Sequence, residues 1–175
     1  MNRLTVFTLV LFAASGASAH EPRLLELLAS IDQVPSAEAL QAAVAKPTAA
    51  LLAVAADEAQ PLYYRERAAT LVSVVPARDA GVALLAVADA SKAPRVRWAA
   101  AYTAVRAFGA TEPAVLDGAL RWLRSSEPGE RDAVIRGLAW VPGTRAAALL
   151  DEAERRETSA ELRRVIANAK ARRTR

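Results

Sequence analysis

The pentapeptide Leu-Leu-Ala-Val-Ala occurs twice in this chain, at Leu51–Ala55 and at Leu84–Ala88. In both copies a proline stands ten positions after the first leucine, at Pro61 and at Pro94. The interval continues downstream, because Pro128 follows Pro94 at nearly the same distance along the chain. Self-similarity at a period of roughly 30 to 47 residues is typical of solenoids, in which each unit buries its apolar face against its neighbours. The repeat therefore predicts an array of similar units.

The units are predicted to be helical. After residue 19, apolar residues recur at helical spacing and are interrupted at short, regular intervals by proline, glycine or capping residues. Because proline fits the first turn of a helix and breaks its interior, each interruption marks a helix start or a loop. The predicted fold class is all-α, an α-solenoid of about four stacked antiparallel helix hairpins. Ten helices are expected, over residues 22–31, 36–44, 47–56, 61–74, 78–90, 94–108, 112–124, 128–140, 144–156 and 159–172.

Residues 94–123 hold the best-formed unit of the repeat. It opens on Pro94-Arg95-Val96-Arg97, continues with a run of alanines, turns between Gly109 and Pro113, and closes on a leucine-rich stretch. This order of residues resembles a HEAT repeat of the short bacterial kind, and the clearest repeats cover about residues 47–172. The resemblance implies an α-solenoid that holds other macromolecules, and it brings no shared catalytic residues.

The first residues have the composition of a secretory signal peptide. Arg3 precedes the apolar run Leu4–Ala14, and Ala17-x-Ala19 fits cleavage after residue 19. We therefore expect residues 1–19 to be removed and residues 20–175 to form a single HEAT-like domain in the periplasm or outside the cell. A retained membrane anchor is the alternative, although the uncharged stretch is shorter than the roughly 20 residues of a spanning helix.

Several kinds of chemistry lack the residues they need. The chain has no cysteine, which excludes disulfides, thiolate metal sites and a lipidated cysteine. His20 is the only histidine, which argues against a two-histidine copper site and against a serine triad. The acidic residues Asp151 and Glu152 are expected to form ion pairs with Arg155 and Arg156, four positions later on the same helix, and not to act as catalytic carboxylates. The prediction is a protein without catalytic residues, cofactor or metal.

The three tryptophans recur through the repeats. Trp98 and Trp140 are expected to fill the core between hairpins. Trp122 has two interpretations, a core residue or, with Arg121 and Arg124, a partner-binding cluster of the composition typical of interface hot spots. These residues lie on a predicted second helix, and second helices line the concave face of HEAT solenoids. The leading prediction is thus a monomeric scaffold that binds an unknown protein partner through this face. A weaker alternative is an enzyme-like role, because some bacterial HEAT-like proteins resemble bilin lyases.

Basic residues gather at the end of the chain. The net charge is +4, or +3 without Arg3. The candidate anionic-surface patch is Arg163, Arg164, Lys170, Arg172 and Arg173. These residues either form the solvated side of a capping helix or bind an anionic envelope surface, at ~1 kcal/mol per basic residue. An apolar stripe of Leu162, Val165, Ile166 and Ala169 favours the capping helix. No nucleic acid partner is expected for an exported chain.

The predicted signal peptide leads to the first testable prediction. The protein isolated from its native host should begin at His20 and carry no lipid, because Ala17-x-Ala19 directs cleavage and the chain lacks a cysteine. Intact-mass measurement of the purified protein checks this. A mass that includes Met1 would contradict it.

Overall fold

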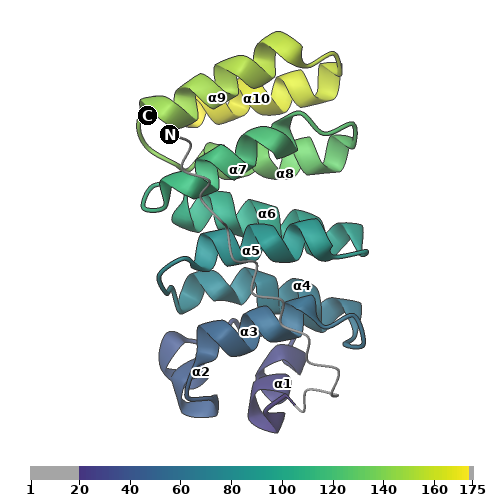
Figure 1. The fold of residues 1–175 in the computed structure, drawn as a ribbon, viewed down its shortest axis with the longest axis vertical. Coiled ribbons are helices and arrows are strands. Elements are labelled where there is room, and N and C mark those ends of the chain that lie inside the picture. Colours follow the sequence, from purple (N-terminus) through teal and green to yellow (C-terminus); the bar gives the residue numbers. More distant parts are fainter. Residues whose placement is uncertain (1–19, 174–175) are drawn as a thin grey trace, which may run out of the picture.

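The computed structural model describes residues 20–173, and in this part of the chain every regular element is a helix. Figure 1 shows the helices stacked one above another along the long axis, from α1 and α2 at one end to α9 and α10 at the other. They are α1 (Pro22–Ala29), α2 (Ala37–Ala43), α3 (Pro47–Ala56), α4 (Leu62–Leu71), α5 (Ala80–Ala90), α6 (Pro94–Phe108), α7 (Pro113–Leu123), α8 (Pro128–Leu138), α9 (Thr144–Arg156) and α10 (Ala160–Arg173), with a short 3-10 helix, η1 (Val72–Val74), after α4. The predicted signal peptide lies outside the described residues.

All ten expected helices are found, and no end is displaced by more than three residues. Prolines set many of the starts, because α1, α3, α6, α7 and α8 each have proline in the first turn. The start of α5 is later than expected, since Asp79 adopts a left-handed φ of 61° immediately before it. At the start of α10, the hydroxyl of Ser159 accepts the backbone N–H of Leu162 at 3.4 Å and so caps the helix.

The helices form two rows. Helices α4, α6, α8 and α10 contact one another in succession, and we call them the even row; α3, α5, α7 and α9 do the same and form the odd row. At the first end, α1 packs on α4 and α2 packs on α3. Most consecutive helices also touch between the rows, and one apolar core lies between them.

Helix α6 lies in the middle and contacts α4, α5, α7 and α8. Its alanines Ala100, Ala101 and Ala104 are completely buried, so α6 is enclosed by its neighbours. Small side chains allow neighbouring helix backbones to approach closely. On α8, a Cβ added at Gly137 would stand 2.9 Å from the Cβ of Val105, so glycine is needed where α8 crosses α6.

An arginine occupies the fourth position of every even-row helix. These residues, which we call the N4 arginines, are Arg65, Arg97, Arg131 and Arg163. The guanidinium of Arg65, a residue only 3% exposed, donates to the carbonyl of Ala55 in the last turn of α3 at 3.2 Å. It also pairs with Glu58 through two bonds of 2.8 and 2.7 Å and donates to the hydroxyl of Ser91 at 2.8 Å. Arg65 thus satisfies a carbonyl at a helix end, which has no partner within its own helix.

Glu157 joins two more N4 arginines at the other end of the stack. Its carboxylate accepts from Arg131 Nε at 2.8 Å and from a second guanidinium nitrogen at 3.2 Å. The same carboxylate accepts the backbone N–H groups of Thr158 and Ser159 at 3.0 and 2.9 Å. The carbonyl of Glu157 accepts from Arg163 Nε at 2.7 Å. One buried residue at the end of α9 therefore connects α8, α9 and α10.

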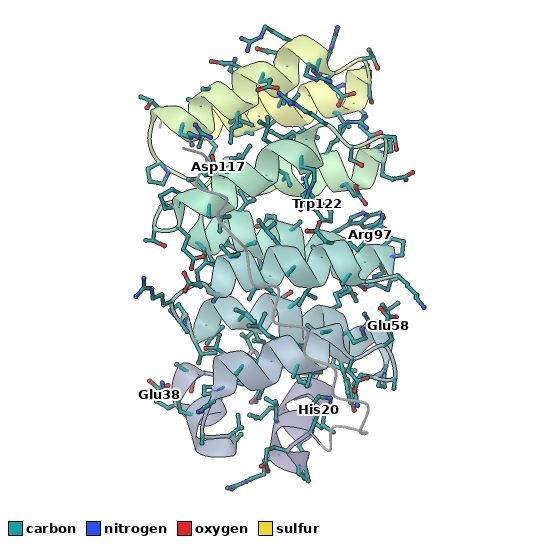
Figure 2. All side chains as sticks on the ribbon, viewed as in Figure 1. His20, Glu38, Glu58, Arg97, Asp117 and Trp122 are labelled. Carbon is teal, nitrogen blue, oxygen red and sulfur yellow. The ribbon has the colours of Figure 1, made fainter. Side chains whose placement is uncertain are left out.

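Arg97 on α6 is the N4 arginine that binds the next even-row helix, α8. It pairs with Glu130 of α8, whose other oxygen accepts the hydroxyl of Ser125 in the α7–α8 loop. From that loop, the carbonyls of Ser125 and Ser126 accept from Arg131 at 2.9 and 3.0 Å. Figure 2 places Glu58 and Arg97 at the same edge of the stack. The network therefore follows the edge at which the even-row helices begin.

The expected ion pairs within α9 are wrong. Asp151 binds Lys170 of α10 at 2.7 Å, and Glu152 binds Arg124 of α7 at 2.6 Å. Side chains on α9 point toward the cations of the helices packed on either side, and these lie closer than the arginines one turn further along α9. Both carboxylates form ion pairs as expected, but their basic partners lie outside α9. The pKa of Asp151 is lowered by its hydrogen bond to Lys170, and that of Glu152 by its hydrogen bond to Arg124.

No single helix of residues 20–173 is both long and apolar enough to cross a membrane. Helices α2 and α3 meet the length and hydropathy requirement only as a pair, and the two are bent by 81° relative to each other.

Acid is expected to loosen the end of the stack at Glu157. The hydrogen bond from Arg131 lowers the pKa of this carboxyl below its usual value of about 4.3. A depressed folded-state pKa stabilises the fold above the unfolded pKa, and the contribution is lost as the pH falls through the folded value. We therefore expect the unfolding midpoint to be steady from about pH 7 to pH 5 and to fall below about pH 4.

Glu157→Gln should flatten this acid dependence and lower stability by about 2–4 kcal/mol at neutral pH. Glu152→Gln, which breaks a more exposed pair, is the matched control and should cost less than about 1 kcal/mol. Urea denaturation across the pH series measures both. An acid dependence that is identical in Glu157→Gln and the parent protein would contradict the assignment.

Removing α10 should expose the end of the core. Leu162, Ile166 and Ala169 are buried and Val165 packs beside them, which confirms the predicted apolar stripe. Covering each aliphatic side chain contributes about 1.5–3 kcal/mol. We expect truncation before Ser159 to cause aggregation or a much lower melting temperature, whereas Arg164→Ala on the exposed side leaves the melting curve unchanged. A truncated chain that melts like the parent would show that α10 is an accessory tail.

Candidate functional site: an aromatic and arginine surface

The predicted partner-binding residues lie at the end of α7 but do not form one exposed cluster. Arg121 and Arg124 are exposed and line a groove of about 740 Å³. Trp122 is only 4% exposed and belongs to the core, as the first of its two interpretations proposed. Figure 2 shows it within the body of the stack. Its ring therefore offers a partner almost no surface, although it forms part of the groove lining.

The charges beside this groove are already paired within the protein. Arg121 binds Asp89 of α5 at 2.5 Å, and Arg124 binds Glu152 of α9 at 2.6 Å. A further pair on the same row joins Arg145 of α9 to an aspartate of α7. These pairs connect successive odd-row helices. The two arginines of the predicted partner-binding cluster are therefore already paired within the protein.

The five basic residues of the predicted anionic-surface patch are dispersed. Lys170 binds Asp151 and Glu154, which raise its pKa. Arg163 donates to the backbone at the end of α9, and Arg173 donates to the carbonyls of the α8–α9 connection. Of the five, only the side chains of Arg164 and Arg172 have neither an ion pair nor a hydrogen bond within the described residues. This distribution matches the capping-helix interpretation.

The expectation that Trp98 and Trp140 fill the core is wrong. Trp98 is 39% exposed, and its ring lies over the start of α8, where a Cβ at Gly129 would come within 2.4 Å of it. Trp140 is 48% exposed, because α8 ends at Leu138 and leaves the tryptophan in the following turn. Both rings are thus partly exposed on the even row, and neither is a buried core residue.

These rings belong to stripes that run along the outer side of neighbouring even-row helices. Each stripe follows an i, i+4, i+8 spacing, which keeps its members on one side of a helix. The stripes are Trp98, Tyr102 and Arg106 on α6, Asp132, Arg136 and Trp140 on α8 and its following turn, and Arg164, Asn168 and Arg172 on α10. Corresponding positions on α6 and α8 are one repeat period apart, so the repeat brings them side by side.

Arginine and aromatic side chains meet where these stripes end. Arg106 Cζ lies 4.9 Å from the centre of the Trp140 ring and 5.8 Å from that of Tyr102. Arg172 Cζ lies 3.9 Å from the centre of the Trp140 ring. We call these four residues, Tyr102, Arg106, Trp140 and Arg172, the Trp140 surface. Such distances are those of cation–π contacts.

The two arginines of the Trp140 surface, Arg106 and Arg172, lack the ion pairs that many other arginines of the protein form. Among residues 20–173, neither Arg106 nor Arg172 has a carboxylate at ion-pair distance. Both lie in the last turn of their helices, where the helix dipole favours a cation. Their guanidinium edges therefore keep N–H donors available to an anionic group.

Two shallow grooves flank Tyr102. One, of about 410 Å³, is lined by residues of α6 and by Thr70 and Ser73 of the α4 side. The other, of about 360 Å³, lies between α8 and α10, with Trp140 and Arg172 at its side. The second combines the apolar side chains Ala139, Val165 and Ala169 with the polar Arg136 and Asn168. The surface can therefore receive an apolar group beside an anionic one.

The sequence contains a signal for this site that composition alone does not reveal. Tyr102 and Arg106 are four residues apart on one helix, and Arg136 and Trp140 repeat the spacing on the next. The large apolar ring of Trp140 suggests a core residue, and this prediction drew attention away from the spacing. The exposure of Trp140 is decided by its position just beyond the end of α8.

Among residues 20–173, no group of three or more acidic or histidine side chains is arranged to hold a metal ion. His20 instead binds Asp57 through Nε2 at 2.9 Å, and this bond is the main cause of the lowered pKa of Asp57. Comparison of the chain with protein-family models, with curated proteins and with solved structures finds no match in any of the three.

Proposed function

We propose that the chain is an exported, non-enzymatic scaffold of the HEAT-like α-solenoid type that binds a protein partner. Three observations support the solenoid: the regular repeat of the pentapeptide and the prolines, the resemblance of residues 94–123 to a HEAT unit, and the packing of the helices in two rows. Such an array offers a long exposed side on which neighbouring repeats present equivalent positions.

The docking site of this proposal is the Trp140 surface. The observation that carries it is a tryptophan 48% exposed, with two arginines over its ring that have no carboxylate partner among the described residues. Tryptophan, tyrosine and arginine are the residues most enriched at interface hot spots. The α7 residues supported the same function in the sequence, but Trp122 is buried there and both arginines are paired.

The alternative of binding an anionic envelope surface through the C-terminal helix has less support. It requires the five basic residues to act together, whereas Lys170, Arg163 and Arg173 are held by acceptors within the protein. The remaining two cations lie in one stripe on α10. One of them, Arg172, already contacts Trp140.

Partner capture tests this function. We expect residues 20–175, used as bait in an envelope extract of the native host, to retain one or more specific proteins. Trp140→Ala should abolish this capture, because hot-spot tryptophans contribute about 2 kcal/mol or more. Quantitative mass spectrometry of the retained proteins measures the loss.

The double variant Arg121→Ala, Arg124→Ala is the matched control on the odd-row face and should retain the same proteins. All variants change exposed or surface-lining side chains, so thermal melts should confirm an intact fold. Loss of capture in the control but not in Trp140→Ala would return the docking site to α7. Equal capture by every variant would contradict both locations.

A further inference from the structure

We infer that the Trp140 surface takes a linear acidic segment of a protein partner, with carboxylates on Arg106 and Arg172 and one apolar side chain in the groove beside Trp140. This inference rests on the proposed function and adds the chemistry of the bound segment to it.

Cations without an ion-pair partner favour an anionic ligand. The guanidinium carbons of Arg106 and Arg172 lie 4.9 and 3.9 Å from the centre of the same Trp140 ring. Among residues 20–173, neither guanidinium has a carboxylate at ion-pair distance. A carboxylate bound to the free edges of the guanidinium groups would form charge-assisted hydrogen bonds with them.

The groove between α8 and α10 favours a peptide as the source of that carboxylate. Its apolar lining, Ala139, Val165 and Ala169, lies next to the indole ring and within reach of the Arg172 end. An aliphatic or aromatic side chain fits against this apolar part of the groove, whose volume is about 360 Å³. Asn168 and Arg136 supply donors at the side of the groove, where a peptide carbonyl would lie.

The acidic residues of the same face argue against a flat anionic membrane. Asp132 pairs with Arg136 on α8 at 2.7 Å, and Glu161 is close enough to Arg136 to help raise its pKa. These carboxylates lie toward the beginnings of α8 and α10, away from Arg172. A lipid surface would meet both regions at once, whereas a narrow segment can place its acidic groups at the helix ends only.

The test uses residues 20–175 and a fluorescein-labelled probe peptide in which one leucine is flanked on each side by alternating glutamate and aspartate. We expect binding by fluorescence anisotropy that weakens as salt is raised from about 0.05 to 0.5 M. Arg106→Gln and Arg172→Gln should each weaken binding about tenfold, which corresponds to ~1.4 kcal/mol. Arg121→Gln, a paired arginine on the odd row, is the matched control and should bind like the parent.

A second probe carries glutamine and asparagine in place of the acidic residues, and it should not bind. Equal binding of the two probes, or binding unaffected by Arg106→Gln and Arg172→Gln, would overturn the inference. So would arginine-dependent binding to vesicles with about one-third anionic phospholipid when the acidic probe does not bind.

The two proposals fail in different ways. If Trp140→Ala abolishes partner capture but the acidic probe does not bind, the docking surface stands and its acidic ligand is wrong. If the acidic probe binds through Arg106 but the Trp140→Ala variant still captures the partner, the ligand chemistry is supported and the docking site of the proposed function is wrong.

Discussion

The packing of this protein depends on the arginines at the fourth position of the even-row helices. Each one links its own helix to another part of the protein. Arg65 binds the end of α3, and Arg97 binds α8. Arg131 binds the loop after α7 and the Glu157 carboxylate, while Arg163 binds the Glu157 carbonyl at the end of α9. Helix ends leave carbonyls without partners, and a short-helix array has many such ends. The N4 arginines satisfy several of them and fix the spacing between successive helices. Alanine-rich contacts such as those of α6 then complete the core.

Much of this fold could be predicted from the sequence, because proline spacing and helical periodicity are local signals. The ten helices and the apolar stripe of α10 follow from them. The partners of charged side chains could not be predicted in the same way. Asp151 and Glu152 have arginines at the favourable spacing on α9, yet they bind Lys170 and Arg124, because interhelix distances decide the pairing.

The candidate site shows the same limit. Trp98 and Trp140 were expected in the core from their size, and their exposure depends on where α6 and α8 place them. Gly129 lets the Trp98 ring lie over α8, and the end of α8 at Leu138 leaves Trp140 in a turn. The two candidate surfaces therefore differ: Arg121 and Arg124 pair with carboxylates, while Arg106 and Arg172 contact an aromatic ring.

The central claim is that the N4 arginines hold the array together, and a double-mutant cycle on Arg131 and Glu157 tests it most directly. Both side chains should be changed to methionine singly and together, and unfolding free energies measured by urea denaturation. We expect a coupling energy of about 2 kcal/mol or more for this largely buried pair. The exposed Arg145–Asp117 pair should give about 0.5 kcal/mol or less. Equal coupling in the two pairs would show that the N4 arginines act as ordinary surface charges and would contradict the account.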